Sequence, residues 1–81
     1  MKFSVSRSVE GEDFLTCLPT DWFDSEKSAR ERYDEYVRQS HTMFGVPTKA
    51  GIYEVRIGFF SVDESDSVKA IAKFVRTIVV R

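Results

Sequence analysis

The sequence predicts an α+β fold in which one helix packs on one face of a four-stranded antiparallel sheet, in the order β-β-α-β-β. Three observations support this class. One amphipathic segment, Asp24–Phe44, lies near the middle of the chain. Strand-like segments flank it in pairs, and a short polar turn joins the two strands of each pair. The 81 residues are expected to form one domain, residues 1–81, with a small core.

The segment Asp24–Phe44 has the clearest helical pattern in the chain. Its semi-apolar side recurs every three or four residues and comprises Ala29, Tyr33, Tyr36, Val37, Ser40 and Phe44. Charged side chains occupy the opposite side. Asp24 or Ser25 can cap the first turn, and Gly45 followed by Pro47 predicts the end of the helix.

Two strands are predicted before this helix. The first, Lys2–Val9, alternates in the manner of a half-buried strand. One side of this alternation comprises Phe3, Val5, Arg7 and Val9. Glu10–Asp13 forms a polar turn, and Phe14–Leu18 is the partner strand, which Pro19 ends. Residues Asp21–Asp24 are expected to link this hairpin to the helix.

Two further strands are predicted after the helix. Ile52–Val62 alternates, and its Gly58 indicates a bulge or a close backbone approach. After the polar turn Asp63–Ser67, the segment Ser67–Arg81 is rich in β-branched residues, which favours a strand. A helix over Val68–Val75 followed by a short strand is the alternative for this segment.

One helix covers only one face of a four-stranded sheet, so the second face is predicted to lie open. Its apolar side chains are expected to be Ile52, Phe60, Val62, Ala70, Ala72, Phe74 and Ile78. A contiguous exposed patch of this kind usually marks an interface. The sequence therefore predicts a homodimer, or a complex with a protein partner, formed through the C-terminal hairpin.

Two other segments are candidates for contact with a protein partner. Trp22 and Phe23 are large rings between two aspartates, and one of them is expected to pack on the first helical turns as a hydrophobic staple. The other ring is a candidate for contact with a protein partner, and we take Trp22 as that candidate. The acidic surface of the helix is the second candidate, and it comprises Glu31, Asp34 and Glu35.

The charge is uneven along the chain, although its sum is only −1. Residues 10–35 contain nine acids and three bases, whereas residues 67–81 contain four bases and no acid. We favour the interpretation that these regions fold against each other. The alternative is a basic binding strip at the C-terminal end. A net charge near zero provides no general attraction to nucleic acid.

No group of residues predicts catalysis, a cofactor or a metal. Cys17 and His41 are each the only residue of their type, and a nucleophile pair needs a third group to orient the base. Zinc needs four ligands, and the turn Asp63–Ser67 lacks the spacing of a calcium loop. A single cysteine excludes an intrachain disulfide, and no apolar run has membrane length. We therefore expect a cytoplasmic protein without a membrane segment.

We interpret the chain as a small, non-enzymatic protein–protein interaction module. Regulators and phage-type inhibitors of this size act by occupying the surface of a partner. The alternative is single-stranded nucleic-acid binding by the C-terminal hairpin, because aromatic rings stack on bases and cations hold phosphates. The side chains suited to that function are Arg56, Phe60, Lys69, Lys73, Phe74 and Arg76.

Overall fold

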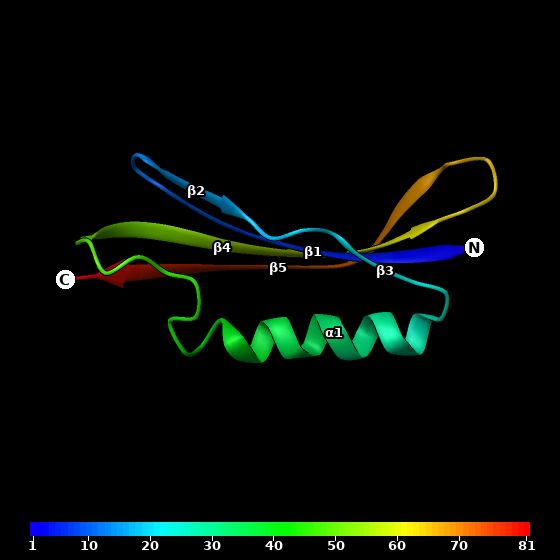
Figure 1. Cartoon of the computed structure of the whole chain (residues 1–81), viewed down its shortest axis with the longest axis horizontal. Helices are drawn as coiled ribbons and strands as arrows, with labels where there is room; N and C mark the ends of the chain where they lie inside the picture. The colour runs from blue at the N-terminus through cyan, green and yellow to red at the C-terminus, as the bar shows by residue number, and fades with distance from the viewer.

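The computed structural model describes residues 1–81, and it places one helix along one face of an antiparallel sheet (Figure 1). The elements are β1 (Lys2–Gly11), β2 (Phe14–Cys17), β3 (Asp21–Phe23), α1 (Glu26–Gln39), β4 (Gly51–Val62) and β5 (Val68–Val80). The predicted α+β class is confirmed. The C-terminal segment is a strand throughout, so the alternative helix does not occur there.

The sheet has five strands, in the order β2-β1-β4-β5, with β3 also paired to β1. The central pair is β1 with β4, which runs from Lys2 opposite Val62 to Gly11 opposite Tyr53. The other edge of β1 is shared: β2 pairs with one end of it and β3 with the other. The interpretation of the segment Asp21–Asp24 as a plain link is therefore wrong. The chain leaving β2 runs back along β1 and pairs with main-chain groups that β2 leaves free.

Helix α1 starts where the sequence indicates but ends earlier than Phe44. Ser25 is the N-cap, and its hydroxyl accepts a hydrogen bond of 3.1 Å from the N–H of Ser28. At the other end, the Ser40 hydroxyl donates to the carbonyl of Val37 at 2.6 Å. The positive φ angles of Met43 (61°) and Gly45 (71°) then turn the chain away from helical geometry.

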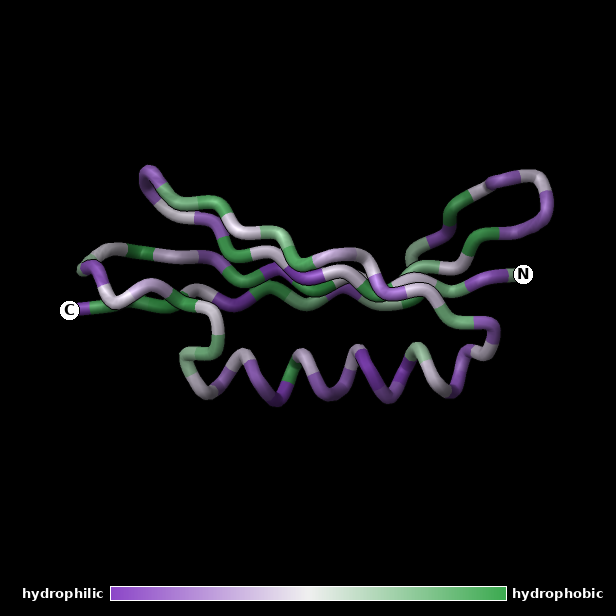
Figure 2. The backbone as a smooth tube through the Cα atoms, viewed as in Figure 1, coloured by the Kyte–Doolittle hydropathy of each residue, from purple (hydrophilic) through white to green (hydrophobic).

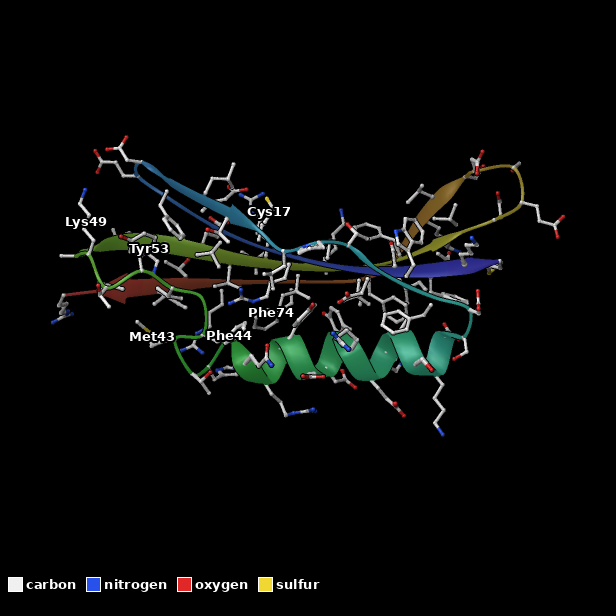
Figure 3. The ribbon with its side chains drawn as sticks, in the orientation of Figure 1. Cys17, Met43, Phe44, Lys49, Tyr53 and Phe74 are labelled. Atoms are coloured by element: carbon white, nitrogen blue, oxygen red, sulfur yellow. The ribbon has the colours of Figure 1, made fainter.

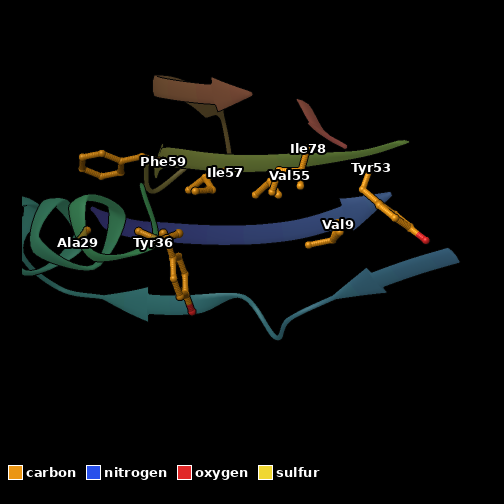
Figure 4. Packing of buried hydrophobic residues seen from close by; sticks show 9 residues of the cluster. Val9, Ala29, Tyr36, Tyr53, Val55, Ile57, Phe59 and Ile78 are labelled. Atoms are coloured by element: carbon orange, nitrogen blue, oxygen red, sulfur yellow. The ribbon is translucent and has the colours of Figure 1, made fainter. Parts of the chain in front are cut away.

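The core lies between α1 and the sheet (Figure 4). We call this side of the sheet the covered face and the opposite side the uncovered face. The buried apolar side chains of the covered face and of α1 are Val5, Val9, Ala29, Tyr36, Tyr53, Val55, Ile57, Phe59 and Ile78. The predicted alternation of β1 is thereby confirmed, since Val5 and Val9 share the covered face.

Gly58 accommodates a close approach, which is one of the two features that its position in the strand indicates. A Cβ at this position would lie 2.3 Å from Cε2 of Phe60, because that ring lies across the glycine. A register shift follows between Phe59 and Phe60, opposite Ala72 and Ala70. Ile71 is therefore an extra residue in β5, and it packs against the core.

The outer ends of both hairpins bend away from α1 (Figure 1). The β1–β2 turn bends at one end of the sheet and the β4–β5 turn at the other. In the second turn, the Asp63 carboxylate accepts hydrogen bonds from the Ser65 hydroxyl and from the N–H groups of Ser67 and Ser65, which lower the pKa of Asp63. The helix of this structure is too short and too polar to cross a membrane.

Candidate interaction surfaces

The uncovered face carries most of the large apolar side chains that the protein exposes. The chain has nine such side chains, and six of them lie on this face, each 55% to 67% exposed. They are Leu15, Trp22, Ile52, Val68, Val75 and Val79. By contrast, the outward side of α1 is mainly hydrophilic (Figure 2). The exposed apolar surface is therefore concentrated on one side of the molecule.

The predicted position of Phe74 and Ile78 on this face is wrong. Phe74 lies opposite Ile57 and Ile78 lies opposite Tyr53, so both belong to the covered face. Ile78 is only 6% exposed. Figure 3 shows Phe74 on the side of α1. Ala72, opposite Phe59, is displaced in the same way.

The bulge explains this error. Ala70 points to the uncovered face with Phe60, as alternation predicts. Because Ile71 is an extra residue, the alternation of β5 changes phase beyond it. The side chains on the uncovered face are then the odd-numbered ones: Lys73, Val75, Thr77 and Val79.

The other predicted side chains do share the uncovered face. Ile52 is 67% exposed there, and Phe60 and Val62 are half-buried. Trp22 joins them because β3 pairs it with Ser4, which lies beside Phe60. Sequence reasoning selected Trp22 for its size but missed the strand that places it. The neighbouring ring, Phe23, packs against the core, and one of the two rings was expected to do so.

The middle of the uncovered face is polar and balanced in charge. A shallow depression of about 240 Å³ lies over Gly58, and Ser6, Phe60 and Lys73 line it. Beside it, Arg56 forms ion pairs with Glu54 at 2.8 Å and with Glu10 at 3.9 Å. The face thus has apolar side chains toward its two ends and a polar centre.

The side chains considered for nucleic-acid binding do not form one surface. Arg56, Phe60 and Lys73 lie on the uncovered face, whereas Phe74, Arg76 and Lys69 point to the other side. Arg76 donates a hydrogen bond of 3.0 Å to the carbonyl of Ser40 and contacts the His41 ring. Arg56 is held by two carboxylates. Few of these cations are therefore free to hold phosphates together.

The acidic and basic regions of the chain do not fold against each other. The acidic hairpin end and β3 lie at one edge of the sheet, and β5 lies at the opposite edge, beyond β1 and β4. The ion pairs of the structure involve Arg32 and Arg56, and none involves a base of β5. The favoured interpretation is wrong, and the basic segment is left without carboxylate partners.

The outward side of α1 is not a continuous acidic surface. Glu31 and Asp34 are exposed, but Glu35 lies 3.7 Å from Arg32. The helix contains four acids and four bases, so its charge sums to zero. Arg32 also lies 3.4 Å from Asp21. The predicted acidic site therefore offers little net charge to a basic partner.

Two arginines on the covered face hold the segment that follows α1. Arg7 is 2% exposed, and its guanidinium donates to the carbonyl of Phe44 and lies 5.1 Å from the centre of that ring. Burial lowers the pKa of Arg7. Arg76 holds the carbonyl of Ser40. Cations near carbonyls at a helix C-terminus are favourable, so these contacts stabilise the fold.

Cys17 and His41 lie on opposite sides of the sheet. Cys17 is exposed and lies opposite Ser8 on the uncovered face (Figure 3). The His41 ring packs against Phe74 on the covered face, with ring centres 6.3 Å apart. The structure contains no group of three or more His, Cys, Asp or Glu side chains that could hold a metal ion.

No family model, curated protein or solved structure matches this chain. Its surfaces are therefore the basis on which a function is proposed. Two of them are unusual for a small protein: the apolar uncovered face, and the basic strand β5 at one edge of the sheet.

Proposed function

We propose that this protein is a non-enzymatic protein–protein interaction module that forms a homodimer through its uncovered face. The observation that carries the proposal is the concentration of exposed apolar side chains there, with Trp22 and Ile52 among them. Apolar side chains exposed together on one side of a small protein are typical of an interface. Covering it removes this surface from water, which favours association.

The dimensions and charges of the face suit a second copy. The Cα atoms extend over 45 × 21 × 17 Å, and the strands run along the longest direction (Figure 1). Standard interfaces bury ~800 Å² per partner, so a dimer of this kind would use most of the face. Its central charges, Glu10, Glu54, Arg56 and Lys73, sum to zero. A two-fold axis can place apolar ends on apolar ends and the balanced centres on each other.

The mode of action follows from this architecture. A module of this kind works as a regulator or inhibitor by occupying the surface of its partner. The free, exposed thiol of Cys17 suits a reducing compartment, so we place the protein in the cytoplasm. Cys17 and His41 are separated by the sheet, which argues against a nucleophile pair.

The mass of the protein in solution tests the dimer. Light scattering should give twice the chain mass at high concentration, and Ile52→Asp should give the monomer mass because it adds a charge to the interface. Met43→Asp is the matched control: Met43 is 48% exposed but lies in the segment after α1. The dimer is excluded if the unmodified chain stays monomeric at high concentration. It is also excluded if both variants dissociate equally.

A further inference from the structure

Strand β5 forms a long free edge of the sheet. It has thirteen residues, Val68–Val80, and pairs only with β4. The opposite edge consists of β2 and β3, with four and three residues, and Pro19 lies between them. Proteins usually keep exposed edge strands short or interrupt them, because free N–H and C=O groups pair with other chains. The edge of β2 and β3 follows that rule through its short strands, whereas β5 is long and is interrupted only by its lysines and the extra residue Ile71.

β5 is also the least covered strand of the central sheet. Helix α1 contacts mainly β1, β3 and β4. Of the residues of β5, only Ile78 is buried, whereas Val68, Val75 and Val79 are 65%, 58% and 55% exposed. Its β-branched residues favour an extended backbone. The edge is therefore a preformed template for one more strand.

The charges along this edge all have the same sign. Lys69, Lys73, Arg76 and Arg81 are the charged residues of the segment 67–81, and none is within ion-pair distance of a carboxylate. Lys73 points to the uncovered face and Lys69 to the covered side, and both are exposed. An added strand would therefore meet a base on either side of the sheet. Acidic side chains complement this arrangement.

A second copy of the chain is a poor occupant of this edge. Pairing β5 with another β5 brings together two strands whose charges are all positive, which like-charge repulsion disfavours. The acidic edge of a second copy offers only short strands interrupted by Pro19. Nucleic-acid phosphates would meet the bases but would not pair with the row of main-chain groups. An acidic peptide in an extended conformation satisfies both features.

We propose that the free edge of β5 accepts an extended, acidic segment of another protein as an additional antiparallel or parallel strand. Main-chain hydrogen bonds provide the affinity, and the bases select acidic side chains. Valines of β5 supply apolar contacts between the charges. The main-chain groups of this site lie outside the proposed dimer interface, because packing through the uncovered face leaves both β5 edges free, although Lys73 and the β5 valines also belong to that face.

A labelled synthetic peptide that alternates glutamate and valine is the probe, and fluorescence anisotropy at low salt is the measurement. We expect saturable binding, and a loss of about tenfold in affinity for Lys69→Glu combined with Lys73→Glu, since two attractive charges become repulsive. Both positions are exposed, and circular dichroism checks that the double variant stays folded. The matched peptide with lysine in place of glutamate should not bind.

Peptide N-methylation tests the added strand itself. One peptide is methylated on every second residue and keeps the N–H groups of one edge, and a second is methylated on every residue and keeps none, while both keep their charges. The first should bind and the second should not. Equal binding of both peptides would overturn strand addition. Failure of the acidic peptide to bind would show that the bases only shield the edge from aggregation.

Two further measurements separate this inference from its alternatives. Tighter binding of oligo-dT than of the acidic peptide would assign the basic edge to nucleic acid and overturn the proposal. Ile52→Asp should leave peptide affinity unchanged, because Ile52 belongs to β4 and β5 lies between it and the free edge. If Ile52→Asp abolished peptide binding, the site would lie on the uncovered face, and the edge proposal would fail while the proposed function stood.

Discussion

The covered and uncovered faces are built from alternate residues of the same strands, yet they have different roles. Phe59 and Phe60 show the contrast within one dipeptide: Phe59 is fully buried against α1, whereas Phe60 is half-buried over Gly58. On β1 the difference is sharper, since valines point to the helix and serines point away from it. The hydrophobic pattern of β1 and β4 thus encodes one buried face. The exposed valines of β5 do not follow that pattern, and they contribute to the apolar surface on which the proposed dimer rests.

The largest expected difference between the faces is the effect of removing these two rings. Phe59→Ala should lower the free energy of unfolding by about 3–5 kcal/mol, because it leaves a cavity under α1 and removes the contact with Arg30. Phe60→Ala should cost far less. Denaturant unfolding measures both. Similar losses for the two variants would contradict the assignment of the core to one face.

A smaller effect is expected at Tyr36, which joins the helix to β3. Its hydroxyl donates a hydrogen bond of 2.6 Å to the carboxylate of Asp21. Tyr36→Phe should therefore cost about 1.5–3 kcal/mol at neutral pH, the range for hydrogen bonds to charged groups. The matched control is Tyr33→Phe, since Tyr33 is half-buried on the same helix. No loss at Tyr36 would show that this bond does not hold α1 to the sheet.

Tyr36 should also make the stability of the fold decrease at alkaline pH. Burial, and then the bond to Asp21, raise the pKa of Tyr36, so the folded state favours its neutral form. This stability is complete below the ordinary tyrosine pKa of about 10 and is lost as the pH rises through the higher folded value. Unfolding at a series of pH values should show the decline. It should be smaller in Tyr36→Phe, with a remainder from Tyr33, whose pKa burial also raises.

Gly58 provides a test from the uncovered side. Gly58→Ala should cost about 1 kcal/mol, because its new Cβ displaces the Phe60 ring. Combining it with Phe60→Ala should remove that cost, and a double-mutant cycle in denaturant measures the coupling. Additive effects of the two changes would show that the ring does not enforce glycine at this position.

The smallest effect is expected on the exposed part of β5. Val75→Thr should change monomer stability by less than about 0.5 kcal/mol, since Val75 is 58% exposed. The same exchange at the fully buried Val55 should cost about 1–3 kcal/mol, because it buries a hydroxyl. A comparable loss at Val75 would mean that this side chain is buried within the subunit.

Regular alternation was enough to predict most of the fold. The faces of β1 and β4 follow directly from residues such as Val5 and Val55, and the N-cap at Ser25 follows from its position before the helix. The strand β3 was missed because three residues carry no detectable alternation. Its pairing depends on where the chain returns after Pro19, which is a tertiary property.

The candidate surface was predicted only in part. The uncovered face follows from the single helix, and Ile52, Phe60 and Val62 lie on it. The side chains of β5 were assigned to the wrong face because one inserted residue, Ile71, reverses the alternation. Nothing in the local sequence locates such a bulge, since it is defined by the partner strand. The free basic edge could not be predicted without the strand order, because that order separates β5 from the acidic hairpin.

The central place of β1 has a consequence for how the protein folds. Roughly forty residues separate the end of β1 from the start of β4, its main partner. Closing this large loop is slow compared with forming the local β4–β5 hairpin. The β4–β5 hairpin should therefore form first, and β1 and α1 should pack against it in a later step. During synthesis, β1 remains without its partner until β4 has left the ribosome, so its valines are exposed for that time and the nascent chain is most prone to aggregation then.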